Sequence, residues 1–154
     1  MTQTFTLTPI GTVRGGRSAP IDDDWGRESC VIQLDERFDA EALLGLDAFS
    51  HLEVVYLFDR VEESEIELVA RHPRGRQDWP RVGIFAQRGK GRPNRLGVSR
   101  CEIVRVEGAS IRVAGLDAID GTPVLDVKPY MREFGARGEV RQPAWATELM
   151  EGYY

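Results

Sequence analysis

Apolar and polar residues alternate along most of this chain, which is the pattern of β-strands with one buried face. The segments with this pattern are expected to be strands, and they are residues 5–13 with an irregularity at Pro9, 29–34, 51–58, 66–70, 82–88, 98–106, 110–116 and 123–127. Residues 51–58 are apolar at successive positions in their centre, so this strand is expected to be buried on both faces.

Helical periodicity is limited to residues 38–46, with Asp39 as the N-cap, and residues 143–150, which begin at a proline. Their apolar faces would consist of Leu43, Leu44 and Leu46 in the first segment and Trp145, Leu149 and Met150 in the second. Many short strands with few helices predict a mostly β protein, a barrel or a sandwich. We expect one domain over residues 1–154, with an irregular tail from about residue 132.

Length and composition narrow the class of protein. A chain of 154 residues with 42% hydrophobic residues can bury a core without disulfides or metals. No apolar run reaches the roughly 20 residues of a membrane helix, and the first residues lack the pattern of a secretory signal. We therefore expect a cytoplasmic protein with no membrane segment, in which Cys30 and Cys101 are ordinary thiols.

The charge is unevenly distributed. The net charge of −5 argues against a nucleic-acid partner, but residues 71–100 contain nine basic residues and one acidic residue, Asp78. This basic segment has a charge of +8, which leaves −13 for the other 124 residues. A local excess of cations predicts an anionic partner such as phosphate, nucleic acid or a carboxylate ligand. The alternative is a solvated loop whose cations pair with acidic neighbours.

Common catalytic and cofactor motifs do not fit. The glycines before Lys90 have the wrong spacing for a phosphate-binding loop, and no GxGxxG follows a strand. With His51 and His72 as the only histidines and no cysteine cluster, we expect no metal site. Neither a GxSxG sequence nor another nucleophile with a histidine partner indicates a hydrolase.

Several unusual stretches remain. A histidine at the mouth of the 51–58 strand suits either a ligand or a backbone carbonyl. The glycine-rich loop over residues 89–97 suits presentation of a main chain to a small ligand, or simply a tight connection. Residues 117–126 hold three carboxylates next to strand-like sequence, where charges are costly unless they are hydrogen-bonded or functional.

Together these stretches resemble the TsaA/YaeB/VirR family, whose characterised members are TrmO-type tRNA adenine N6-methyltransferases. The matching motifs are IGTVR at residues 10–14, FSHL at 49–52, RHPR at 71–74, GIFAQR at 83–88, RPNRLGVS at 92–99 and DGTPVLDVKPY at 120–130. The resemblance implies a compact β-barrel that forms a homodimer, binds S-adenosylmethionine and methylates N6 of a t6A-type adenosine at position 37 in the tRNA anticodon loop.

The resemblance also implies roles for individual residues. The implied cofactor contacts are Pro20, Ile21, Asp22, His51, Leu52, Arg88, Val98, Asp117, Ala118, Ile119 and Asp120. The implied contacts to RNA are Arg71, Arg74, Arg92, Asn94 and Arg95. The relatives have Pro-Arg-Gln where this chain has Pro20-Ile21-Asp22, and RPNP where it has Arg92-Pro93-Asn94-Arg95. Enterobacterial relatives also have a C-terminal domain that is expected to be missing here.

A catalytic hypothesis follows from comparing residues 126–130, DVKPY, with the DPPY motif of other N6-adenine methyltransferases. Asp126 would accept a hydrogen bond from N6, and Tyr130 would stack on the base. The alternative is that Asp126 and Lys128 form a structural pair at the dimer interface. Three other functions stay open: transfer of the methyl group to a small molecule or another RNA, cofactor sensing without catalysis, and a structural or interaction role.

Overall fold

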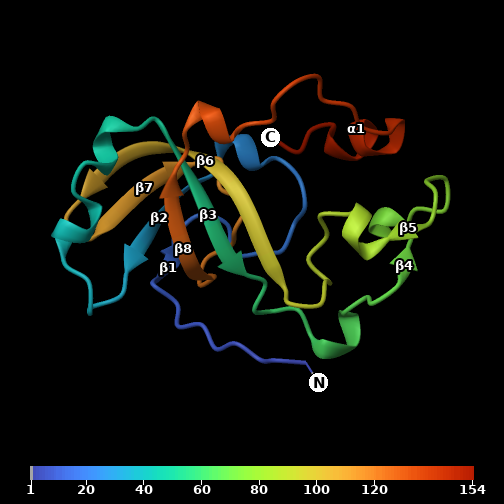
Figure 1. Cartoon of the computed structure of the whole chain (residues 1–154), viewed down its shortest axis with the longest axis horizontal. Coiled ribbons are helices and arrows are strands. Elements are labelled where there is room, and N and C mark those ends of the chain that lie inside the picture. Colours follow the sequence, from blue (N-terminus) through green and yellow to red (C-terminus); the bar gives the residue numbers. More distant parts are fainter. Residues whose placement is uncertain (1) are drawn as a thin grey trace.

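The structure is a computed structural model, and it describes residues 2–154. Six antiparallel strands form a closed barrel in the order β1-β2-β7-β6-β3-β8 (Figure 1). The barrel strands are β1 (Gly11–Arg14), β2 (Ser29–Leu34), β3 (His51–Leu57), β6 (Leu96–Glu107), β7 (Ser110–Ala114) and β8 (Pro123–Pro129). A separate two-stranded sheet consists of β4 (Ala70–Arg71) and β5 (Val82–Gly83). The expectation of a mostly β barrel is confirmed.

The interior of the barrel is filled by the inward-facing residues of the alternating strands. The fully buried members of this core include Val13, Ile32, Leu52, Val54, Ile111, Val113 and Val124. Each such side chain contributes about 1.5–3 kcal/mol by leaving water, so the two-residue period predicted from the sequence fixes the strand register.

Strand β3 departs from the prediction of burial on both faces. Leu52, Val54 and Tyr56 are buried, whereas Glu53, Val55 and Leu57 on the outer face are only half-buried. The apolar run at residues 54–57 therefore has one face that no other element within residues 2–154 covers completely.

The barrel closes through a short pairing of its first and last strands. Only Gly11 and Thr12 of β1 pair with β8, opposite Val124 and Pro123. A Cβ atom on Gly11 would lie 2.4 Å from the carbonyl oxygen of Gln33, so glycine permits the close approach of β2 on the other side. Segments before β1 and β8 extend this junction by further backbone hydrogen bonds.

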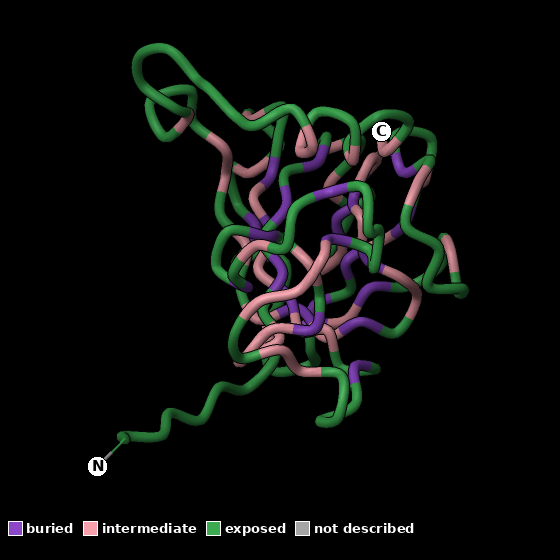
Figure 2. Tube along the Cα trace, turned by 90° about the vertical axis from the view of Figure 1, so that its right-hand side faces the viewer, coloured by how far each residue is buried: buried purple, intermediate pink, exposed green. Residues whose placement is uncertain are grey.

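The first predicted strand was too long. Residues 2–9 lie outside the sheet as an exposed extended segment, in which Phe5 and Leu7 are 76% and 64% exposed (Figure 2). Pro9, which lacks an N–H group, precedes the point at which pairing begins. The predicted strands at 66–70 and 82–88 are likewise reduced to the two-residue strands β4 and β5.

Short 3₁₀ turns replace the helix predicted at residues 38–46. They are η2 (Ala40–Leu43) and η3 (Leu46–Ala48), and Gly45 between them has a φ of 88°. Asp39 caps η2 as predicted, because its side chain accepts a 2.8 Å hydrogen bond from the Glu41 N–H. Leu44, expected on the apolar face, is 83% exposed.

The other 3₁₀ turns lie in the connections. They are η1 (Trp25–Arg27), η4 (Glu63–Glu65), η5 (Pro73–Gly75), η6 (Ile84–Ala86) and η7 (Arg132–Phe134). The second predicted helix is confirmed as α1 (Ala144–Met150). It lies in the irregular tail, above β4 and β5 in Figure 1, and the chain then returns to the barrel.

Both cysteines are free and buried in the core. Burial raises the pKa of the Cys30 thiol to about 11 and that of Cys101 to about 12. Within residues 2–154, no group of three or more cysteine, histidine, aspartate or glutamate side chains could hold a metal ion. Across the same described residues, no helix has the length and apolar character required to cross a membrane.

Candidate functional site

Three hydroxyl groups converge on the carboxylate of Asp117, in the connection between β7 and β8. Tyr56 of β3 donates to Oδ1 at 3.1 Å, and Ser99 of β6 donates to the same oxygen. Tyr153, in the C-terminal tail, donates to Oδ2. These four residues, which we call the Asp117 cluster, join two barrel strands, a connection and the tail.

Burial raises the pKa of both tyrosines in the Asp117 cluster, and the negative charge of Asp117 raises each pKa further. Both hydroxyls therefore remain protonated donors at neutral pH. Tyr154, which is only partly buried, also has a raised pKa because partial desolvation and the charge of Asp117 disfavour its ionised form, although the nearby charge of Arg88 opposes this effect. The cluster thus stabilises one carboxylate through donated hydrogen bonds.

Residues 117–120 are fastened to the loop that follows β1. The Asp120 carboxylate accepts a 2.9 Å hydrogen bond from the Gly15 N–H, and the Asp120 N–H donates to the Arg17 carbonyl at 2.8 Å. Arg60 donates to the carbonyls of Ser18 and Asp120, at 3.0 and 3.3 Å. Of the other two predicted contacts in this run, Ala118 is buried and Ile119 half-buried.

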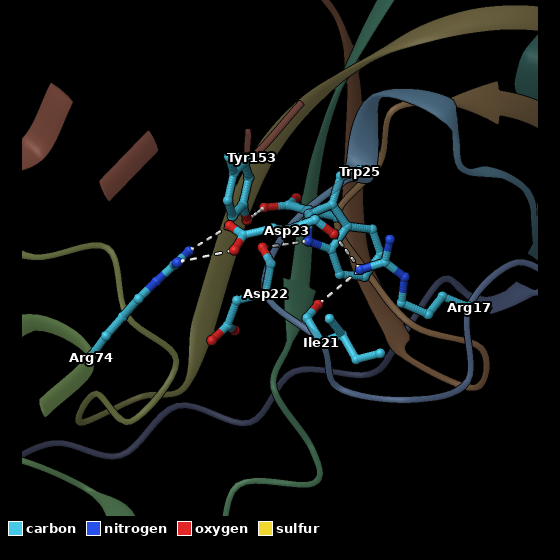
Figure 3. Close-up of polar contacts among 8 residues, drawn as sticks. Arg17, Ile21, Asp22, Asp23, Trp25, Arg74 and Tyr153 are labelled. Carbon is cyan, nitrogen blue, oxygen red and sulfur yellow. Dashed lines mark hydrogen bonds and ion pairs between the residues drawn. The ribbon is translucent and has the colours of Figure 1, made fainter. Parts of the chain in front are cut away.

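Arg17 organises the loop that contains Pro20, Ile21 and Asp22 (Figure 3). Its guanidinium donates to the carbonyls of Ile21, Asp23 and Asp24 at 2.7–3.0 Å, pairs with Glu28 at 3.0 Å and lies 4.0 Å from the centre of the Trp25 ring. The loop therefore wraps around one arginine, and the side chains of the three predicted cofactor contacts remain exposed.

Arg88 and Val98 lie next to the Asp117 cluster. Arg88 donates to the Val98 carbonyl at 2.6 Å, and Val98 directly precedes Ser99. Both side chains are exposed. The structure thus brings together the predicted contacts at residues 20–22, 88, 98 and 117–120.

His51 and Leu52 lie at the other end of β3. At about 3.3 Å per residue, His51 is roughly 17 Å along the strand from Tyr56. Its Nδ1 is 2.7 Å from the Ser50 hydroxyl, and its side chain is exposed. Leu52 is fully buried in the barrel core, so its side chain presents no surface to a ligand.

Three of the five predicted RNA contacts use their guanidinium groups in polar bonds within the fold. Arg74 pairs with Asp23 at 3.0 Å (Figure 3). Arg92 donates to the Gln87 carbonyl at 2.8 Å, and Arg95 donates to the Val61 carbonyl at 2.7 Å. The remaining two contacts differ in exposure: Arg71 packs against Gly89 and Gly91, whereas Asn94 is exposed.

Arg95 has a backbone conformation that proline cannot adopt. Its φ is 52°, and its N–H donates a 3.0 Å hydrogen bond to the Arg92 carbonyl. Proline has no N–H and a φ near −65°. Arg95 stands where the RPNP motif of relatives has its second proline, and this difference permits a backbone conformation in the loop that proline would not.

Asp126 lies on the outer face of the barrel. Across the sheet it is level with Val55 of β3, which is level with Val98 of β6, so the proposed acceptor and one predicted cofactor contact share this face. The Asp126 carboxylate accepts from the N–H of its neighbour Val127 at 2.9 Å. Within residues 2–154 no ion pair joins Asp126 to Lys128.

Tyr130 lies at the end of β8. The guanidinium of Arg100 lies 4.7 Å from the centre of the Tyr130 ring. The backbone N–H of Tyr130 donates to the His51 carbonyl at 2.9 Å. One face of this ring is therefore already covered by a cation.

Sequence reasoning missed Tyr56, Ser99, Arg60 and Tyr153. Ser99 and Tyr56 occupy inward positions of strands, and a polar group at such a position is the signal that could have identified them. Arg60 and Tyr153 bond to residues far away in the sequence, and no local pattern indicates these contacts.

Comparisons with known proteins agree on one family. The model of the tRNA-methyltransferase O N-terminal domain matches residues 14–136. The chain is 33% identical over 136 residues to a "Probable S-adenosyl-L-methionine-binding protein" of Methanothermobacter thermautotrophicus, covering 86% of this chain and 94% of that protein. It is 34% identical over 102 residues to the human "tRNA (adenine(37)-N6)-methyltransferase", which is 66% of this chain but 23% of the human protein.

A solved structure gives the same answer for the fold. The crystal structure of TrmO from Pseudomonas aeruginosa superposes with a TM-score of 0.73 at 28% sequence identity. The match covers 90% of this chain and 62% of that one.

Proposed function

This chain belongs to the tRNA-methyltransferase O N-terminal domain family, and on that premise we propose that it is a methyltransferase that transfers a methyl group from S-adenosylmethionine to N6 of adenine 37 in tRNA. The observation that carries this proposal is the convergence of residues 20–22, 88, 98 and 117–120 around the Asp117 cluster.

The residues around the Asp117 cluster fit the chemistry of the cofactor. S-adenosylmethionine has hydroxyl and amino donors on its nucleoside, and a carboxylate on its amino-acid end. Asp117 already accepts hydroxyl donors within the fold, and this supports a role for its carboxylate in accepting the hydroxyl groups of the cofactor. Arg88 would hold the carboxylate end. When bound, the cofactor would supply an electrophilic methyl group.

The acceptor side of the reaction would lie on the outer face of the barrel. Adenine N6 is a weak nucleophile because its lone pair is conjugated with the ring. An acceptor at the N6 hydrogens would localise this pair, and Asp126 is an exposed carboxylate in the same row as Val98. Tyr130 would stack on the base with the ring face opposite to Arg100.

The basic segment would attract the tRNA backbone. The arginines that bond to carbonyls keep their positive charge, and the exposed side chains of Arg81 and Lys90 add to it. We propose that the segment supplies a general attraction for phosphate, since most of its guanidinium groups already have partners within the fold. We place the protein in the cytoplasm, in accordance with a tRNA substrate.

We also propose a homodimer. The outer face of β3 and β6 presents the half-buried Val55 and Leu57 together with Leu96 and Val98, which are 36% and 42% exposed. A second copy packed on this face would cover its apolar residues, would place the proposed acceptor row of Asp126 and Val98 at the dimer interface, and would explain why β3 is apolar on both sides.

The test uses purified protein, S-adenosylmethionine with a labelled methyl group, and bulk tRNA from a strain that lacks the corresponding gene. We expect label in N6-methylated adenosine, identified by mass analysis of the nucleosides, and a tRNA lacking t6A shows whether that modification is required. Replacing Asp126 by Ala should slow single-turnover methylation by about a hundredfold, whereas the neighbouring Lys128→Gln should not. Undiminished transfer by Asp126→Ala would remove Asp126 from the mechanism.

A different methyl acceptor is the second candidate, and Arg95 is the observation that favours it. Its backbone differs from what the RPNP sequence of relatives allows, so the loop that ends at Arg95 has changed shape. Cofactor binding without transfer to any tRNA would support this candidate over adenine 37.

A further inference from the structure

The last residues of the chain are fastened to the candidate cofactor site. The N–H groups of Asp24 and Trp25 donate to the carbonyls of Gly152 and Tyr153, at 3.0 and 2.8 Å. Further back, the Glu148 carboxylate accepts a 2.7 Å hydrogen bond from the buried indole of Trp79. The tail thus bridges the loop around Arg17 and the basic segment.

The two oxygens of Asp117 have different partners. Oδ1 accepts from Tyr56 and Ser99, which belong to the barrel. Oδ2 accepts from Tyr153 of the tail, and the described residues supply no other hydrogen bond to it. The barrel alone therefore orients this carboxylate, and the tail occupies the oxygen that the barrel leaves open.

The tail is held by polar bonds more than by packing. Helix α1 has no buried residue, Tyr153 is half-buried, and Tyr154 is 61% exposed. Segments with few buried apolar contacts open at low free-energy cost. A ligand that offers equivalent donors can therefore replace the tail.

We propose that the Tyr153 hydroxyl takes the place of a ligand hydroxyl on Asp117 Oδ2, so that the tail is an internal competitor that the cofactor displaces. This inference rests on the proposed function, since the cofactor is the ligand that would bring the competing ribose hydroxyl. Exchange of one hydroxyl donor for another leaves the charge of Asp117 compensated in both states. The apparent affinity is then reduced by the fraction of molecules in which the tail is closed.

The first experiment compares Tyr153→Phe with Tyr154→Phe as the matched control, by calorimetric titration with S-adenosylmethionine. A hydrogen bond to a charged acceptor is worth at least ~1.5 kcal/mol, so Tyr153→Phe should bind the cofactor about tenfold more tightly. Tyr154→Phe removes a hydroxyl that makes no described hydrogen bond to Asp117 and should bind as the unmodified protein does. Unchanged or weaker binding by Tyr153→Phe would overturn the inference.

The second experiment needs no variant. Hydrogen exchange of the unmodified protein is measured with and without S-adenosylmethionine, at the amides of Asp24 and Trp25. Displacement of the tail removes their carbonyl acceptors, so both amides should exchange faster with cofactor present. Unchanged or slower exchange would contradict displacement while leaving the proposed function intact. Failure of the unmodified protein and of both variants to bind the cofactor would overturn the proposed function and this inference together.

Discussion

Replacing Arg17 by Met should destabilise the loop that contains residues 20–22. The Arg17 side chain is 12% exposed, donates three hydrogen bonds to backbone carbonyls and pairs with Glu28. Because the freed carbonyls lie near the surface and can bind water, we take about 1 kcal/mol for each of the four contacts, and about 0.5 kcal/mol for the stacking on Trp25. The free energy of unfolding should therefore fall by about 4.5 kcal/mol.

For a domain of this size, each kcal/mol shifts Tm by about 2–4 °C, so Arg17→Met should lower Tm by about 9–18 °C. Thermal unfolding followed by circular dichroism measures this change, and Arg27→Met, an exposed arginine in the same loop, is the control. Cofactor affinity should fall along with stability, since the loop carries three of the predicted contacts. A loss below about 0.5 kcal/mol, which is ordinary for a surface substitution, would refute the role given to Arg17.

Three further outcomes are expected. The raised pKa values of Cys30 and Cys101 mean that both thiols ionise more easily in the unfolded chain. The contribution of the thiols to the free energy of unfolding should therefore be constant below about pH 9 and then fall by up to about 1.4 kcal/mol per pH unit for each thiol until pH 11–12. Urea titrations at pH 8 to 10.5 measure this fall, and a constant free energy of unfolding would contradict the burial of both thiols. Affinity for tRNA should fall steeply with salt, with a slope reduced by about 1 in Arg81→Gln but not in Arg112→Gln on β7, as measured by filter binding; equal slopes would remove Arg81 from the interface. Ser99→Ala removes one of the two barrel hydroxyls that orient the Asp117 cluster and should weaken cofactor binding about tenfold at little cost in Tm, whereas unchanged affinity would place the cofactor elsewhere.

Alternation of apolar residues was sufficient to predict the barrel strands, because burial of one face dictates both the strand and its register. It failed where burial is not the cause of the local structure. Residues 66–70 have strand-like composition, yet only Ala70 of this segment lies in a strand, together with Arg71, since the small β4–β5 sheet has no closed core to extend it. The 38–46 segment has helical spacing, but Gly45 with a positive φ divides it into two turns.

The candidate site was predicted in part, and the reason lies in sequence separation. The resemblance indicated segments that the structure does bring together, such as Arg88 and residues 117–120. What it could not indicate is which groups orient the Asp117 carboxylate, because Tyr56 and Tyr153 lie 61 and 36 residues away from it. Nor does charge counting reveal that the arginines of the basic segment bond to carbonyls, as Arg92 and Arg95 do.

The short pairing between β1 and β8 makes this edge the seam of the barrel. The loop after β1 begins at this seam and the run before β8 ends at it, and hydrogen bonds from Gly15 and Asp120 already join the two segments. A ligand bound by both segments would link the first and last strands of the barrel. Binding should then raise the free energy of local opening, most strongly at β1 and β8 and less at the longer β6–β7 pairing.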